Sequence, residues 1–195
     1  MLQAIAYQSI SMILLEMMIP LGFNVAISVR VSNELGAGNA EAACFSVFVS
    51  VATSSIISII FAIVFLLCKN FLGYLFTGSS TVAERVSELV PFLTASILLN
   101  GIQAVLLGVA IGSGSQYYVA NVNLISCYMV GLPLGILICF QFELGITGIW
   151  SGMIAGTSLQ SLILLYATWN TNWNEQARQA TDCLRAWRSD LIVSP

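Results

Sequence analysis

Long apolar stretches separated by short polar turns are the main pattern of this 195-residue chain. A helix needs about 20 residues to cross the roughly 30 Å of hydrocarbon in a bilayer, so continuous apolar runs of that length indicate membrane spans. Five such runs occur, approximately at residues 4–29, 43–68, 86–110, 117–140 and 144–169. Because lipid offers no partner for exposed backbone N–H and C=O groups, each run is expected to be a helix. The pattern therefore predicts an all-α, polytopic transmembrane helix bundle.

Composition supports the membrane interpretation and excludes several classes of function. The chain is 58% hydrophobic and 8% charged, with a mean hydropathy of +0.92, whereas about a quarter of the residues in soluble domains are charged. Six Lys and Arg in a chain of net charge −3 are too few for a nucleic-acid partner. The chain has no histidine, and its five cysteines show no CxxC spacing, so no metal site or disulfide framework is expected. An enzyme is disfavoured because no nucleophile and base pair can be assembled.

The distribution of charge divides the chain and sets its orientation. Residues 1–170 form the five-span transmembrane part, and residues 171–195 form a polar, amphipathic tail. Basic residues on one side of the membrane are Arg30, Arg178, Arg185 and Arg188, and those on the other side are Lys69 and Arg85. By the positive-inside rule, the C-terminal tail and the Arg30 loop are expected in the cytosol. Trp169, Trp173 and Trp187 are candidate headgroup anchors for the tail.

Glu16 is an ionisable residue near the middle of the first run, four residues before Pro20. Proline removes one backbone hydrogen bond, so the helix is expected to bend there. A carboxyl at membrane depth is costly and is a functional candidate by default, here as a proton carrier. The alternative is a neutral or water-connected carboxyl that packs against a helix outside this chain.

Two further groups of polar residues are candidates for lining a cavity. Asn100 and Gln103 are three residues apart in the third run, so they share one helix face. In the fourth run, Asn121 and Tyr128 belong to a polar stripe that fades before Pro133, a second expected bend. Amides and tyrosines suit an aromatic, hydroxylated or cationic ligand. The alternatives are hydrogen bonds between helices for the amides and interfacial anchoring for the tyrosines.

The stretch "SVRVSNELGAGN" concentrates charge and glycine between the first two runs. Taken alone, it is typical of a cytosolic helix end. Arg30 compensates the helix dipole, Asn33 and Glu34 offer side-chain caps, and Gly36 and Gly38 supply a left-handed turn.

The same stretch resembles a signature of the plant branch of the multidrug and toxic compound extrusion (MATE) transporters. The resemblance extends through "IPLGFNVAISVRVSNELGAGNAEAA", "SILLNGIQAVLLGVAIGSGSQYYVANVNL", "YMVGLPLGI", "LGITGIWSGMIAGTSLQSLILL" and "TNWNEQA". It implies that the five spans correspond to the eighth to twelfth helices of a two-lobe, twelve-helix transporter, so that the N-terminal lobe and the seventh helix are missing.

The resemblance also implies a function. It is proton-coupled antiport of organic compounds, such as flavonoid conjugates or alkaloid-like and xenobiotic cations, by alternating access in the vacuolar or plasma membrane. The proton gradient is the energy source and no cofactor is expected. Many plant relatives have a proton-coupling aspartate where this chain has Asn100, and the "LLNGIQ" form is similar to a subset that includes vacuolar transporters of the transparent-testa type.

Because an amide cannot release a proton, Glu16 or a glutamate in the missing seventh helix would have to titrate. Two rival functions remain open. One is a truncated, non-transporting product that associates with full-length transporters, since five helices cannot build a two-lobe cavity. The other is a channel, which the lack of a charged ring disfavours.

Overall fold

Helices make up almost the whole of the computed structural model, which describes residues 2–69, 80–141 and 145–193, with side chains described at 17–69, 89–141, 145 and 147–187. The elements are α1 (Leu2–Gly36), α2 (Ala40–Leu67), α4 (Ser80–Gly112), α5 (Gln116–Leu124), the π-helix η1 (Ile125–Gly131), α6 (Leu132–Gln141), α7 (Ile146–Trp169) and α8 (Trp173–Val193). Helices cover all five apolar runs, so the all-α prediction is confirmed.

Four stretches of the described chain are long and apolar enough to cross a membrane. They are Ala40–Leu67, Leu89–Gly112, Gln116–Gln141 and Thr147–Trp169. The first predicted span, residues 4–29, falls on α1, and the side chains of its first part lie outside the described residues. Together these helices define an integral, multi-pass membrane bundle.

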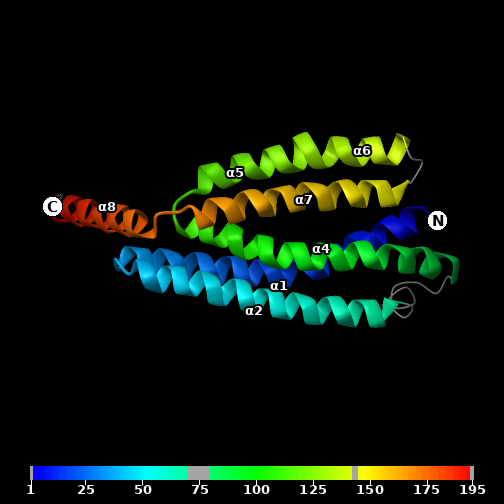
Figure 1. Cartoon of the computed structure of the whole chain (residues 1–195), viewed down its shortest axis with the longest axis horizontal. Helices are drawn as coiled ribbons and strands as arrows, with labels where there is room; N and C mark the ends of the chain where they lie inside the picture. The colour runs from blue at the N-terminus through cyan, green and yellow to red at the C-terminus, as the bar shows by residue number, and fades with distance from the viewer. Residues whose placement is uncertain (1, 70–79, 142–144, 194–195) are drawn as a thin grey trace.

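Helix α4 is central to the bundle (Figure 1). It lies between α7 on one side and the pair α1 and α2 on the other, while α5, η1 and α6 pack along α7. Helix α8 extends beyond the bundle along its long axis and contacts α1 and α2. The predicted polar tail is therefore a helix attached to one end of the bundle. Its Trp173 is half-buried against the core cluster of α1, α2 and α4, whereas Trp169 and Trp187 are exposed, and the role of the three as headgroup anchors stays a prediction.

The signature stretch ends α1 with two hydrogen bonds that satisfy its last carbonyl groups. The N–H of Asn39 donates to the carbonyl of Glu34 (2.8 Å), and the N–H of Gly38 donates to the carbonyl of Leu35 (3.0 Å). This is a Schellman ending, in which Gly38 has φ +80°. The prediction that Gly36 also supplies a left-handed turn is wrong. Gly36 is the last helical residue, and a side chain there would lie 3.1 Å from the Cδ1 atom of Leu184 in α8.

Close backbone contacts at glycines hold neighbouring helices together. A Cβ added at Gly108 of α4 would collide with the backbone carbonyl of Asn24 in α1. A Cβ added at Gly152 of α7 would collide with the backbone of Gly135 in α6. Lipid tails are as apolar as the protein, so helices in a membrane associate mainly through such close packing and through hydrogen bonds. These two glycines therefore set how near α4 approaches α1 and how near α7 approaches α6.

The two intramembrane prolines have different surroundings. Helix α1 continues through Pro20 without interruption. In the fourth span, η1 ends two residues before Pro133, and the N–H of Leu132 donates to the carbonyl of Cys127, five residues earlier. Pro133 has no N–H to donate to the carbonyl four residues before it, and a wider turn accommodates this missing bond.

We expect Gly152→Ala to destabilise the protein by about 1–3 kcal/mol, because the added methyl forces α6 and α7 apart. The matched control is Gly22→Ala in α1, where nothing lies within 4 Å of an added Cβ. The control should be neutral or stabilising by up to about 1 kcal/mol, since alanine is the better helix former. Thermal unfolding in detergent micelles measures the stability of both variants relative to the unmodified chain. Equal melting temperatures for the two variants would contradict the proposed glycine contact.

Candidate functional site

Asn100 lines a small cavity between three helices of the bundle. The cavity has a volume of about 70 Å³. Its lining residues are Met17 of α1, Ser96, Leu99 and Asn100 of α4, and Trp150, Met153, Ile154 and Thr157 of α7. The walls combine sulfur, aromatic and aliphatic groups with one amide and two hydroxyl groups.

The two hydroxyl groups in this cavity donate hydrogen bonds to backbone carbonyls of their own helices. Thr157 donates to the carbonyl of Met153 (3.0 Å), and Ser96 donates to the carbonyls of Phe92 (3.3 Å) and Leu93 (3.2 Å). A hydroxyl that donates in this way still has lone pairs that accept hydrogen bonds. The cavity therefore offers acceptor oxygens from two sides in addition to the amide of Asn100.

The size of the cavity limits what it can hold in this conformation. A dry apolar cavity of about 150 Å³ accommodates benzene, and one water occupies about 30 Å³ of liquid volume. At about 70 Å³, the Asn100 cavity suits small hydrogen-bonding species and is too small for an aromatic ring system. An organic cargo would need the helices around Asn100 to move apart.

The other predicted cavity residues lie elsewhere. Gln103 is half-buried on α4 and does not line the Asn100 cavity. Asn121 is exposed, and its amide donates to the carbonyl of Tyr117 in its own helix (2.8 Å). Tyr128 is 66% exposed on η1. The polar stripe expected in the fourth span therefore faces outward from these helices, and the structure does not bring Asn121 and Tyr128 to Asn100.

The side chain of Glu16 lies outside the described residues, so its role stays a prediction. Its neighbour Met17 lines the Asn100 cavity. Pro20 is buried and lines a second, larger cavity of about 220 Å³ between α1, α2 and α4. The remaining lining residues of this second cavity are Ile19, Ile57, Ser58, Phe61, Phe65 and Ile97. It is almost wholly apolar, with the hydroxyl of Ser58 as its polar group.

Among the buried polar residues that the sequence analysis missed, Gln160 and Ser126 carry side-chain atoms without a hydrogen-bond partner in the described part of the chain. Gln160 of α7 is 4% exposed and Ser126 of η1 is fully buried. The Nε2 atom of Gln160 and the Oγ atom of Ser126 have no hydrogen-bond partner within the described part of the chain. Gln160 lies one helical turn after Thr157, a residue of the Asn100 cavity. A lone amide inside an apolar span was the signal that could have identified Gln160.

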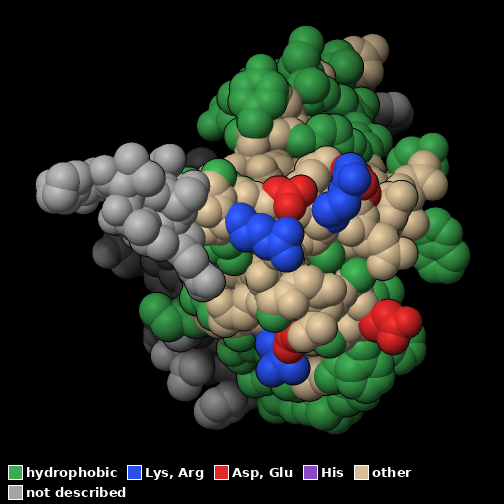
Figure 2. All heavy atoms as spheres, turned by 90° about the vertical axis from the view of Figure 1, so that its left-hand side faces the viewer, with side chains coloured by type: hydrophobic (Ala, Val, Ile, Leu, Met, Phe, Trp, Pro, Cys, Tyr) green, Lys and Arg blue, Asp and Glu red, His purple; other side chains and the backbone are tan. Residues whose placement is uncertain are grey.

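Charged side chains gather at the end of the bundle that carries α8 (Figure 2). The Arg30 guanidinium pairs with the Glu34 carboxylate at 2.9 Å, so Glu34 forms an ion pair within its helix and is not a helix cap as predicted. The added Cβ position of Gly38 lies 3.7 Å from the Oγ1 atom of Thr181, and Ala177 is buried in the cluster of α1, α2 and α4. Helix α8 is thereby attached to the signature turn. No group of three or more His, Cys, Asp or Glu that could hold a metal ion occurs among the described residues.

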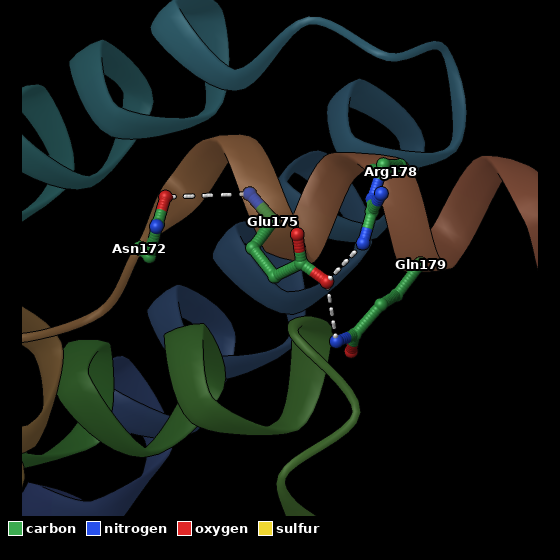
Figure 3. A network of polar contacts seen from close by, with 4 residues as sticks. All are labelled: Asn172, Glu175, Arg178 and Gln179. Atoms are coloured by element: carbon green, nitrogen blue, oxygen red, sulfur yellow. Dashed lines mark hydrogen bonds and ion pairs between the residues drawn. The ribbon is translucent and has the colours of Figure 1, made fainter.

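A small polar network lies at the start of α8, which is not among the four candidate membrane spans (Figure 3). The N–H of Glu175 donates to the Asn172 side-chain oxygen (3.3 Å), and the Glu175 carboxylate accepts from Arg178 (2.9 Å) and Gln179 (3.1 Å). The hydrogen bond from Arg178, followed by that from Gln179, lowers the pKa of Glu175 below its ordinary value of 4.5. Only a charged carboxylate gains both bonds fully, so they favour the ionised form.

Comparison with known proteins identifies the class of protein that this helix arrangement defines. The bundle matches the crystal structure of a eukaryotic MATE transporter, AtDTX14, with a TM-score of 0.87 and 34% identity over 92% of this chain and 40% of that one. The MatE family model matches residues 4–137. The chain therefore belongs to the MATE family of membrane transporters.

Plant relatives agree with this assignment. Protein DETOXIFICATION 36 of Arabidopsis thaliana is 47% identical over 173 residues, which are 89% of this chain and 34% of the relative. Protein DETOXIFICATION 33 of the same plant is 50% identical over 170 residues, 87% of this chain and 35% of the relative. The chain thus spans about a third of the length of these relatives.

We expect the Glu175 carboxyl to titrate below pH 4.5 and to return toward that value in Arg178→Gln, because the largest cause of the lowered pKa is then lost. A lowered folded pKa contributes stability above the unfolded value, and this contribution is lost as the pH falls through the folded pKa. Carbon-13 NMR of the Glu175 carboxyl measures the titration. An unchanged midpoint in Arg178→Gln would contradict the assigned cause.

Proposed function

We propose that this chain is the C-terminal part of a proton-coupled antiporter that moves small organic compounds across a membrane by alternating access. Membership of a transporter family and the multi-pass helix bundle support transport over catalysis. The observation that carries the proposal is the cavity at Asn100, because hydrogen-bonding side chains at membrane depth are costly and are functional candidates by default. Flavonoid conjugates and alkaloid-like or xenobiotic cations are the proposed cargo, and the proton gradient is the energy source.

The small volume of the cavity supports a division of roles between conformations. At about 70 Å³ the Asn100 cavity has room for solvent and protons but not for such cargo. In an alternating-access cycle, a carrier passes between states whose cavities differ in size and in the side to which they open. We assign the conformation described here to a state in which this part of the pathway is closed to cargo.

The arrangement of charge supports a cytosolic C-terminus. Arg30, Arg178 and Arg185 lie at the end of the bundle that carries α8, whereas Lys69 lies beyond the far end of α2. Basic residues near the ends of spans are enriched on the cytosolic side. The proposed location is the vacuolar or the plasma membrane, with α8 and the signature turn in the cytosol.

Transport by the 195-residue chain needs a direct comparison, because the chain spans about a third of its relatives. Proteoliposomes with an imposed pH gradient would receive either this chain or a version joined to the N-terminal two thirds of a relative. We propose that only the extended form takes up a fluorescent flavonoid or cationic dye. Uptake by neither form would overturn antiport, and association of this chain with a full-length transporter would favour the non-transporting alternative.

In the extended form, we expect Asn100→Asp to shift the pH profile of uptake, because it places a titratable group in the cavity. Asn100→Leu is the matched control, since it removes the amide without adding a carboxyl. It should lower uptake at every pH without moving the profile. Initial uptake rates between pH 5 and 8 give the pH profile of each variant. A profile unchanged by Asn100→Asp would place Asn100 outside the proton path.

The role of Glu16 has its own test. We expect Glu16→Gln to abolish gradient-driven uptake in the extended form, because glutamine keeps the shape and cannot carry a proton. Counterflow exchange of labelled for unlabelled cargo without a gradient shows whether the variant still binds. Gradient-driven uptake that is unchanged in Glu16→Gln would exclude Glu16 as the proton carrier.

A further inference from the structure

Two side chains from neighbouring helices donate hydrogen bonds to backbone carbonyl groups of α4. The side-chain amide Nδ2 of Asn24 in α1 donates to the carbonyl of Ala104 (2.9 Å). The hydroxyl of Ser54 in α2 donates to the carbonyl of Gly101 (2.8 Å). Ser54 is 2% exposed, and its hydrogen bond is buried. Each bond links residues at least 47 positions apart, whereas most described Ser and Thr hydroxyls donate within their own helix, as Ser46 does to Ala42.

Both acceptors belong to the turn of α4 that follows Asn100. In an α-helix, a carbonyl accepts the N–H four residues later, and its second lone pair stays available for another donor. Residues 101 and 104 are three apart and so lie on one face of α4. That face meets α1 and α2, while Asn100 projects into the cavity shared with α7.

The packing leaves little room for a side chain at two glycines of α4. A Cβ at Gly101 would collide with the hydroxyl of Ser58, and a Cβ at Gly108 would collide with the carbonyl of Asn24. Glycine thus brings the α4 backbone within reach of both donors. The close contact sets the distance between helices, and the two directional bonds set how far α4 is rotated and shifted along its axis.

We propose that Asn24 and Ser54 are positioning residues of the Asn100 cavity. Through the carbonyls of Ala104 and Gly101, they fix the height and rotation of the α4 turn that carries Asn100. A shift of one residue along a helix moves a side chain by 1.5 Å and turns it by about 100°, which would take Asn100 out of the cavity. The glycine contacts exclude registers that would bring a larger residue against α1, and the two directional hydrogen bonds then hold α4 in the register that is adopted.

The importance of Asn24 and Ser54 for transport rests on the proposed function of the cavity. Their positioning role can be tested first without a transport assay. Trp150 lines the Asn100 cavity and is 7% exposed. Replacing Trp169, Trp173 and Trp187 by Phe leaves Trp150 as the single tryptophan of the chain. Acrylamide quenching of its fluorescence, in nanodiscs that contain the whole chain, then reports how tightly the cavity wall is packed.

Asn24→Leu and Ser54→Ala are the test variants, and each removes one donor to α4. The matched controls are Asn121→Leu and Ser46→Ala, whose side chains donate within their own helices. We expect the test variants to raise the quenching constant of Trp150 by about threefold or more, since one hydrogen bond between membrane helices shifts an equilibrium by roughly three- to tenfold. The controls should leave it within experimental error.

The outcomes separate positioning from general stabilisation. If the test variants melt earlier but quench like the controls, the two bonds only join helices and the proposal is overturned. Ser54→Ala removes a single oxygen atom, so it keeps the test valid if Asn24→Leu fails to fold. In the extended transporter, we expect both test variants to raise KM for cargo more than they lower kcat. Altered quenching without any uptake by the unmodified extended form would preserve the positioning role and refute the transport function.

Discussion

Lipid gives two touching helices no hydrophobic gain, so this bundle depends on backbone contacts close enough for dispersion and hydrogen bonding to hold it. Glycine makes those contacts possible at Gly108 against α1 and at Gly152 against α6. The result is two tightly packed units, one of α1, α2 and α4 and one of α6 and α7. The position of the Asn100 cavity depends on how these two units meet.

The two units meet along α4 and α7, where the contacts are of a different kind. Larger side chains fill this interface, including the buried pair Leu106 and Leu164, and the Asn100 cavity interrupts it. Long side chains such as Met153 can change rotamer without moving a backbone, whereas contacts between glycine backbones have no such freedom. In the proposed transport cycle, a change in cavity volume would therefore be easiest at this interface, and the glycine contacts on either side would keep each unit rigid.

Hydropathy was sufficient to predict the helices but not the direction in which each side chain points. Run length and the backbone constraint of lipid identified every helix that spans the described bundle. Rotation could not be predicted in the same way, because core and lipid are both apolar. Helix α2 illustrates the problem, since buried Ala62 and exposed Phe48 are both hydrophobic.

The fourth span shows the same limit in its polar residues. Asn121 and Tyr128 were expected to line a cavity, and within this chain both are exposed, so that role stays a prediction, while the less conspicuous Ser126 is buried. The π-helical turn of η1 changes which residues share a helix face compared with a regular α-helix. No residue type in this stretch predicts such a turn. Only the nearby Pro133 indicated that the helix would be irregular there.

Asn100 also constrains how the proposed proton coupling can work. An amide hydrogen-bonds in the same way across the physiological pH range, so the cavity can keep its shape while a proton is carried elsewhere. Met17 lines this cavity and directly follows Glu16 in α1. A change in the charge at Glu16 would therefore act on α1, and α1 is bonded to the Asn100 turn through Asn24 and Ala104. Under the proposed coupling, the titrating residue would be separate from the cavity amide, and the hydrogen bond between α1 and α4 would connect them mechanically.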